Sequence, residues 1–193
     1  GMGIVKDQDG ELFVTDNQGY QNLYNELNHL SPGSHFAFPN QYDDIKSFPP
    51  PSKTTVQIPH PWTRSVNGIA LIPSGGSFGP FGGQFVAADF TTRKLIRISL
   101  QKVGQKYQGA AYPFSLEDNR LLANDQTFLS PFSMTFSPKG DLYVGSLIDS
   151  GWGGGNNRGA VEKVTFRGSL PQGIKHLPRL KQLNVEENEL PGF

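Results

Sequence analysis

The sequence predicts an all-β fold made of repeated antiparallel sheets, and three observations lead to that expectation. A strand-turn-strand unit recurs three times along the 193 residues. Each copy is followed by a further segment with the composition of a strand. The 23 glycines and 15 prolines supply the many turns that short strands require, without the regular repeat of a collagen.

The first and last copies of the unit are the most alike. They read GIVKDQDGELFVTD over residues 3–16 and SMTFSPKGDLYVGS over residues 133–146, and they align without a gap. Asp9-Gly10 and Lys139-Gly140 fall at the same place in the two copies, and both are typical of a turn between two strands. The middle copy, residues 68–90, keeps both strands but carries a glycine-rich excursion in place of the tight turn.

Further strands are expected after each hairpin. The candidate segments are NELNHLSPGSHFAF (25–38), RKLIRISLQ (93–101) and GAVEKVTF (159–166). Sheets of four antiparallel strands repeated side by side are the plan of a β-propeller, so we predict an all-β, β-propeller-like fold of about three four-stranded blades. Three unrelated hairpins in another all-β fold, such as a sandwich, are the alternative.

The expected boundaries describe one propeller-like domain over residues 3–193. They place blade cores at about 3–38, 67–113 and 132–167, and a closing strand or short helix within 171–193. The segments from Asn40 to Pro59 and from Gln105 to Gln126 are rich in proline, asparagine and charge. They are expected to form long connections on one rim, where loops often carry function.

The composition excludes several classes of partner and site. Basic and acidic residues balance at 17 each, so neither nucleic acid nor an anionic membrane is predicted as a partner. The chain has no cysteine and therefore no disulfide or thiolate chemistry. No apolar stretch reaches the ~20 residues of a membrane span, and no signal segment opens the sequence. The four histidines lack metal-ligand spacing, so no metal site is assigned.

Three loops that follow the second strand of each unit are the candidate binding surface. The first holds Asp16, Asn17 and Gln18, and the second begins at Asp89 and ends at Arg93. The third holds a tryptophan face, two amides and a cation, at Trp152, Asn156, Asn157 and Arg158. Aromatic faces and amide groups suit a sugar, and the repeat predicts that all three loops emerge on one face. A plain strand connection, with Trp152 folded under it, is the alternative for the third loop.

The segment from Asn25 to Pro39 resembles the signature Asp-Glu-Leu-Asn, Pro-Gly and aromatic-Pro of the soluble glucose and sorbosone dehydrogenases. The resemblance continues in order through Asn67-Gly68-Ile69-Ala70, the segment 83–100 and the segment 131–168. It implies part of a six-bladed propeller, an oxidoreductase acting on CH–OH groups of sugars, and a periplasmic or extracellular location. It adds Asn25, Glu26, Asn28, Trp62 and Arg64 to the candidate ligand-binding residues.

The resemblance also implies pyrroloquinoline quinone and calcium as cofactors. The quinone carries several carboxylates, and the family holds them with basic side chains. Here those positions hold Thr91, Ser130 and Phe132, so charge-assisted hydrogen bonds of about 1.5–3 kcal/mol each are missing. No residue is assigned as the catalytic base.

Two functions from different classes follow from the sequence. The first is a sugar-dehydrogenase-like propeller section that binds a sugar or similar polar ligand on its loop face. The second is a non-catalytic interaction or structural module. An arc of three blades would expose two apolar sheet faces, so we expect either a homo-oligomer or missing blades supplied by a longer natural chain.

Overall fold

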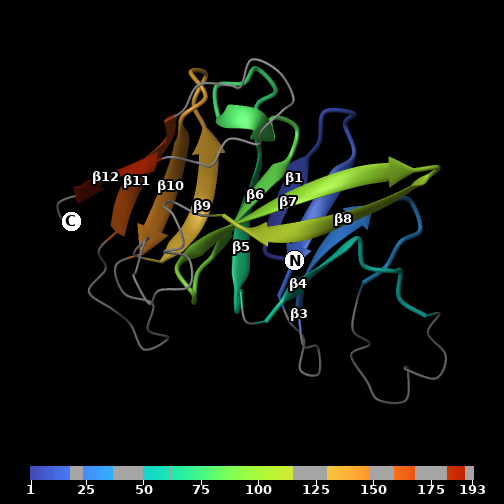
Figure 1. Ribbon diagram of the computed structural model, residues 1–193. Coiled ribbons are helices and arrows are strands. Elements are labelled where there is room, and N and C mark those ends of the chain that lie inside the picture. The colour runs from blue at the N-terminus through green and yellow to red at the C-terminus, as the bar shows by residue number, and fades with distance from the viewer. Residues whose placement is uncertain are drawn as a thin grey trace.

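The computed structural model describes residues 1–17, 24–36, 50–60, 62–114, 130–147, 159–167 and 182–189 of the chain. These residues form three four-stranded antiparallel sheets, each a simple meander in chain order (Figure 1). We call them blades 1, 2 and 3. The predicted all-β propeller-like fold with three four-stranded blades is confirmed.

Each blade contributes four consecutive strands. Blade 1 comprises β1 (Gly3–Lys6), β2 (Leu12–Asp16), β3 (Tyr24–Leu30) and β4 (Val56–Pro59). Blade 2 comprises β5 (Val66–Leu71), β6 (Phe85–Asp89), β7 (Lys94–Val103) and β8 (Lys106–Pro113). Blade 3 comprises β9 (Pro131–Phe136), β10 (Leu142–Leu147), β11 (Gly159–Arg167) and β12 (Gln182–Glu189).

The first and last hairpins have the same turn. Gly10 and Gly140 have φ angles of 91° and 88°, a left-handed conformation that glycine adopts without steric cost. The Gly10 amide donates to Asp7 O, and the Gly140 amide donates to Ser137 O. The gapless alignment of the two sequences therefore corresponds to one local structure used twice.

Two strands lie where the sequence predicted connections. β4 and β8 complete blades 1 and 2, within the segments expected to be rim loops. Only Val56 and Ile58 alternate inward in the four residues of β4, and β8 is dominated by small or polar residues such as Gly109 and Ala110. β4 and β8 form strands because they pair with a neighbouring strand, and not because their sequences alternate between apolar and polar residues. The remaining parts of those loops, 37–49 and 115–129, lie outside the described residues.

The C-terminal segment adds an outer strand. β12 pairs with β11 over eight residues, from Ala160 opposite Glu189 to Arg167 opposite Gln182. The expected closing strand is therefore present, and the helix alternative is wrong for residues 182–189.

Blade 2 lies between blades 1 and 3 (Figure 1). The core consists of one apolar layer on each side of blade 2. The layer between blades 1 and 2 includes Phe13, Leu27, Ile58, Phe85, Ile96 and Ile98. The layer between blades 2 and 3 includes Phe78, Val86, Leu95, Leu142, Val144 and Val164. All five residues of β6 are buried, as expected for a strand covered on both faces.

The first strands of neighbouring blades approach closely at a glycine. A Cβ on Gly3 would lie 2.3 Å from Asn67 O of blade 2, and a Cβ on Gly68 would lie 2.7 Å from Phe132 O of blade 3. These two contacts are equivalent in the repeat. Glycine is required at both places because any side chain would meet backbone of the next blade.

Within the described residues, no helix is long and apolar enough to cross a membrane. The only regular helical segment described is the short 3-10 turn η2 (Gly79–Phe81), inside the glycine-rich excursion of blade 2.

Candidate functional site

Three segments meet at one edge of the sheets, and two of them belong to the loops that the repeat predicted to emerge on one face. They are the end of β2, the link from β4 to β5 and the turn from β6 to β7. We call the described part of this edge, residues 16–17, 62–67 and 89–93, the loop edge. Hydrogen bonds between the segments define it, since antiparallel meanders bring these connections to the same side.

Asp89 joins two of the segments. Its Oδ2 accepts the backbone amides of Arg64 and Ser65, both at 2.7 Å, and its Oδ1 accepts the amide and hydroxyl of Thr92 at 2.7 and 2.8 Å. The side chain is fully buried. A carboxylate with four donors in place is an organising group, because few of its lone pairs stay available to a ligand.

An amide and hydroxyl cluster lies beside that carboxylate. The Asn17 Nδ2 donates to Ser65 Oγ at 3.3 Å, and the Asn67 Nδ2 donates to Ser65 O at 3.1 Å. The Asn17 Oδ1 is shielded from solvent and accepts no hydrogen bond from any described residue. A buried acceptor without a donor is costly, so the Asn17 Oδ1 is an unsatisfied acceptor at the loop edge.

The other predicted residues of the loop edge have different environments. Trp62 packs against the apolar layer between blades 1 and 2, and its carbonyl oxygen lies 3.1 Å from Thr92 Oγ1. The Arg64 side chain is exposed. Arg93 has a φ of 59°, a left-handed conformation unusual for a residue with a side chain. Asp16 is 36% exposed.

The residues taken from the family signature lie on two opposite faces of β3. Asn25 points toward blade 2 and donates from its Nδ2 to Thr63 Oγ1 at 2.7 Å, with both residues buried. Glu26 and Asn28 lie on the other face, where the Asn28 Nδ2 donates to Glu26 Oε2 at 3.1 Å. The structure therefore brings Asn25, but not Glu26 or Asn28, to the loop edge.

Several predicted residues cannot be placed. Gln18, Trp152, Asn156, Asn157 and Arg158 lie outside the described residues. Sequence reasoning missed Thr63, Ser65, Asn67 and Thr92, which join the segments of the loop edge. The sequence does show a run of short hydroxyl and amide residues between two strands. That composition favours hydrogen bonds from side chains to the backbone and could have indicated these residues.

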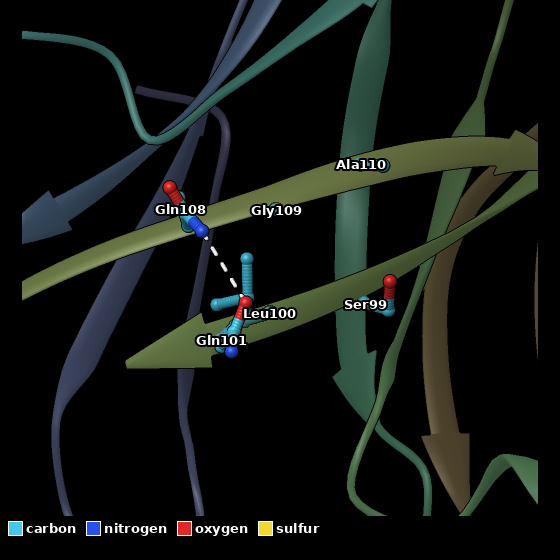
Figure 2. Close-up of a pocket in the computed structure, with 6 residues that line it drawn as sticks. All are labelled: Ser99, Leu100, Gln101, Gln108, Gly109 and Ala110. Atoms are coloured by element: carbon cyan, nitrogen blue, oxygen red, sulfur yellow. Dashed lines mark hydrogen bonds between the residues drawn. The ribbon is translucent and has the colours of Figure 1, made fainter. Parts of the chain in front are cut away.

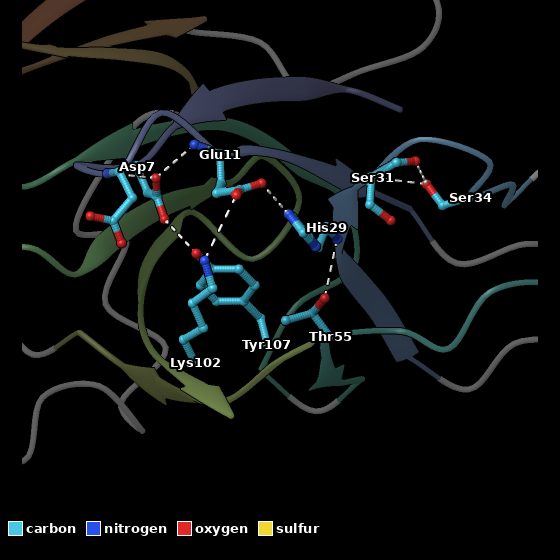
Figure 3. A network of polar contacts seen from close by, with 9 residues as sticks. Asp7, Glu11, His29, Ser31, Ser34, Thr55, Lys102 and Tyr107 are labelled. Carbon is cyan, nitrogen blue, oxygen red and sulfur yellow. Dashed lines mark hydrogen bonds and ion pairs between the residues drawn. The ribbon is translucent and has the colours of Figure 1, made fainter. Parts of the chain in front are cut away.

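A polar network at the opposite edge joins blades 1 and 2 (Figure 3). The His29 Nε2 lies 2.8 Å from Glu11 Oε2, Lys102 Nζ lies 3.8 Å from Glu11 Oε1, and the Tyr107 hydroxyl donates to Asp7 Oδ2 at 3.4 Å. Burial, and then the charge of Asp7, raises the pKa of Tyr107. The side-chain hydrogen bond with Tyr107 raises the pKa of Lys102. These contacts fasten the β7–β8 hairpin to blade 1.

A shallow hollow of about 310 Å³ lies on the same hairpin, away from the loop edge. Figure 2 shows its lining, Ser99, Leu100, Gln101, Gln108, Gly109 and Ala110. The Gln108 Nε2 donates to Gln101 Oε1 at 3.3 Å across it. None of these side chains ionises, and none was predicted as a site residue, so the hollow offers no acid, base or nucleophile.

The described residues do not fit an anionic quinone. At the three positions where the resemblance implies basic side chains, Thr91 is exposed, Ser130 is fully buried and Phe132 is 50% exposed. The Ser130 Oγ meets no hydrogen-bond partner in the described structure, but a hydroxyl is no substitute for a cation. No cluster of three or more His, Cys, Asp or Glu side chains that could hold a metal occurs among the described residues.

Comparison with solved structures gives the fold relationship. The chain superposes on a proposed oxidoreductase (glucose dehydrogenase) from Thermus thermophilus with a TM-score of 0.53 and 16% identity. It superposes on the PQQ-bound form of aldose sugar dehydrogenase from Streptomyces coelicolor with a TM-score of 0.52 and 18% identity. The chain has the fold of these sugar dehydrogenases. No protein-family model and no curated protein matches its sequence.

The match covers a part of those proteins. It includes 80% of this chain in both cases, but 40% and 39% of the two neighbour chains. The resemblance to sugar dehydrogenases indicated by the sequence motifs is therefore confirmed at the level of the fold, for a partial sugar-dehydrogenase propeller.

Proposed function

We propose that this sugar-dehydrogenase-like propeller section binds a sugar or a similar small polar ligand at the loop edge. The observation that carries the proposal is the shielded Oδ1 of Asn17, which accepts no hydrogen bond from a described residue and lies beside Ser65. A ligand hydroxyl would satisfy it once the Asn17 side chain rotates to turn this oxygen toward the ligand. The exposed Arg64 beside this cluster adds donors suited to further oxygens.

The proposal is one of binding, and it assigns no oxidation to this chain. The two structural neighbours are named as sugar dehydrogenases, and one holds PQQ. If this chain is an enzyme, we expect an oxidoreductase acting on CH–OH groups of sugars, with a periplasmic or extracellular location by resemblance. The noncationic residues Thr91, Ser130 and Phe132 argue against a quinone held as in that family.

Calorimetric titration with D-glucose tests binding. We expect Asn17→Ala to weaken the affinity about tenfold, the equivalent of one hydrogen bond of about 1.4 kcal/mol. Gln108→Ala, in the hairpin hollow, is the control and should bind as the unaltered chain does. Equal loss in both variants, or no heat with glucose, galactose or a disaccharide, would contradict a site at the loop edge.

A second titration separates binding from chemistry. Pyrroloquinoline quinone with calcium is added, and reduction of an electron-accepting dye is followed with glucose present. We expect neither saturable quinone binding nor dye reduction. Sugar-dependent dye reduction would overturn the assignment of binding without oxidation and restore the enzyme function.

The alternative function is a non-catalytic interaction module. It is favoured by apolar side chains exposed on the outer faces of the first and last blades, including Ile4 at 62% and Leu147 at 44%. Exposed apolar residues grouped on a sheet face mark surfaces that are covered in an assembly.

A further inference from the structure

The two terminal blades each carry one sheet face that no other blade covers, which we call the open face. Strand alternation gives the open face of blade 1 the residues Ile4, Leu12 and Val14, with Ile4 and Leu12 exposed to 62% and 41%. It gives the open face of blade 3 the residues Tyr143, Leu147 and Val161, the last two exposed to 44% and 37%. Blade 2, by contrast, has apolar layers on both sides.

The open face of blade 1 repeats the face that blade 2 turns toward blade 1. In blade 1, Ile4 is opposite Val14, and Leu12 is opposite Leu30. In blade 2, the matching pairs are Ile69 with Ala87 and Phe85 with Ile98, and all four of those side chains are buried against blade 1. Blade 1 therefore presents the apolar pattern of a blade that packs on a preceding one at Ile4, Leu12 and Val14, while the polar Asn28 takes the place of Ile96.

The open face of blade 3 repeats the face that blade 1 turns toward blade 2. In blade 1, the β2 residues Phe13 and Thr15 and the β3 residue Leu27 are buried there. The gapless repeat puts Tyr143 at the place of Phe13, and the strand register puts Val161 at the place of Leu27. Blade 3 therefore presents the pattern of a blade that receives a following one.

The polar part of the contact between blades 1 and 2 has a counterpart on blade 3. Between blades 1 and 2, Gly3 is paired with Thr15, whose hydroxyl donates to Asn67 O at 2.9 Å. In blade 3 the corresponding pair is Ser133 with Gly145. The Ser133 Oγ lies over the glycine, 2.6 Å from where a Cβ of Gly145 would be. In blade 1 the glycine lies on the first strand and the hydroxyl on the second, and in blade 3 the order is reversed. The pair still offers one hydroxyl donor and one residue without a side chain.

We propose that the open face of blade 3 receives blade 1 of a second copy of this chain, and that two such contacts close a symmetric pair. Each contact continues the interface already present between blades 1 and 2. In that contact, Ser133 Oγ would donate to the backbone carbonyl of Met2 in the other copy, since Met2 holds the repeat position of Asn67.

The match between the two open faces favours a second copy as the occupant. The face of blade 1 repeats one side of the contact between blades 1 and 2, and the face of blade 3 repeats the other side. A closed pair also removes both exposed apolar faces in one step, as closed point symmetry requires.

Sedimentation equilibrium tests the proposal directly. We expect a mass twice that of the 21.2 kDa chain. Ile4→Asp on blade 1 and Val161→Asp on blade 3 should each raise the dissociation constant at least about tenfold, because each places a carboxylate in the apolar contact. Val103→Asp is the control, at a 53% exposed residue in the β7–β8 hairpin that lies on neither open face.

Mixing the two variants tests whether blade 1 of one copy contacts blade 3 of the other. A pair made of one Ile4→Asp chain and one Val161→Asp chain keeps one unaltered contact, so the mixture should associate more strongly than either variant alone. A folded monomer of the unaltered chain at high concentration would overturn the proposal. So would a pair that resists Ile4→Asp or Val161→Asp, because blade 1 and blade 3 would then not meet.

A disulfide supplies a second readout. The sequence has no cysteine, so Met2→Cys with Ser133→Cys introduces the only two thiols. Oxidation should link two copies of the double variant covalently, while Val103→Cys with Ser133→Cys should remain unlinked at the same concentration. Circular dichroism confirms that each variant is folded. Linkage of the control pair, or none in the test pair, would contradict the assigned contact.

Discussion

At the scale of single residues, one carboxylate organises the loop edge. Asp89 ends a strand buried on both faces, and its two oxygens hold the amides of Arg64, Ser65 and Thr92. A sequence pattern shows an acidic residue before a turn and so invites a ligand role. Only the fold reveals that backbone donors already surround it.

Replacing that carboxylate with an amide should destabilise the protein. Asp89→Asn turns one acceptor into a donor that faces buried N–H groups, so we expect the free energy of unfolding to fall by about 2–4 kcal/mol. Urea denaturation measures it. Asp9→Asn, at an exposed turn, should change stability by less than about 0.5 kcal/mol. Equal effects would show that Asp89 is not an organising residue.

The raised pKa of Tyr107 predicts that the folded protein loses stability at alkaline pH. Because burial and Asp7 raise its pKa in the folded state, the folded protein holds the phenol proton more tightly than the unfolded chain does. The stability from this residue is complete below its ordinary pKa of ~10 and is lost as pH rises through the raised value. Tyr107→Phe should therefore reduce the fall in urea midpoint above about pH 10.

The matched control for that experiment is Tyr112→Phe, in the same strand. Its ring lies against the Arg97 guanidinium, 4.5 Å from centroid to Cζ, and not in the polar network. This variant removes a tyrosine of the same strand and leaves the contacts of Tyr107 with Asp7 and Lys102 in place. If the pH profile of Tyr107→Phe coincides with that of the unaltered protein, Tyr107 does not contribute to the loss of stability at alkaline pH.

At the scale of elements, glycine sets the distance between blades. Gly68→Ala would push a Cβ to within 2.7 Å of Phe132 O and 3.0 Å of Ser133 Cα, both backbone atoms. We expect a loss of about 1–3 kcal/mol in thermal or urea unfolding. Gly75→Ala is the control, since nothing lies within 4 Å of its added methyl. A neutral Gly68→Ala would contradict the close approach of β5 and β9.

The elements that the sequence could predict are those with a strong local signal. The hairpins at Gly10 and Gly140 follow from turn chemistry and alternation, and both were found as expected. β4 and β8 were missed because a four-residue strand and a strand with Gly109 and two alanines lack a periodic signal. Their structure depends on an available neighbouring edge, which no local pattern shows.

The sequence predicted the position of the candidate site, the loop edge, but not the orientation or the hydrogen bonds of its side chains. Repetition of the hairpins indicated that the end of β2 and the turn at Asp89 share one edge, and the hydrogen bonds through Ser65 bear this out. The opposite orientations of Asn25 and Glu26 follow from strand alternation. The family signature, a block of adjacent residues, does not by itself distinguish the two faces of the strand.

At the scale of the molecule, the three blades form a series of equivalent contacts with an open face at each end. The same geometry that packs blade 1 on blade 2 is left available on blade 3. The loop edge and the open faces lie at different sides of the blades, so the proposed ligand binding and the proposed association can be tested with independent variants.

The central functional claim is that the loop edge is where a sugar binds. Backbone amide chemical shifts recorded during a D-glucose titration test it most directly. We expect saturable shifts at Asn17, Ser65 and Asn67, with none at the Asp7–Glu11 turn of the opposite edge. Shifts confined to that turn or to the β7–β8 hollow, or no saturable shift with any sugar, would contradict it.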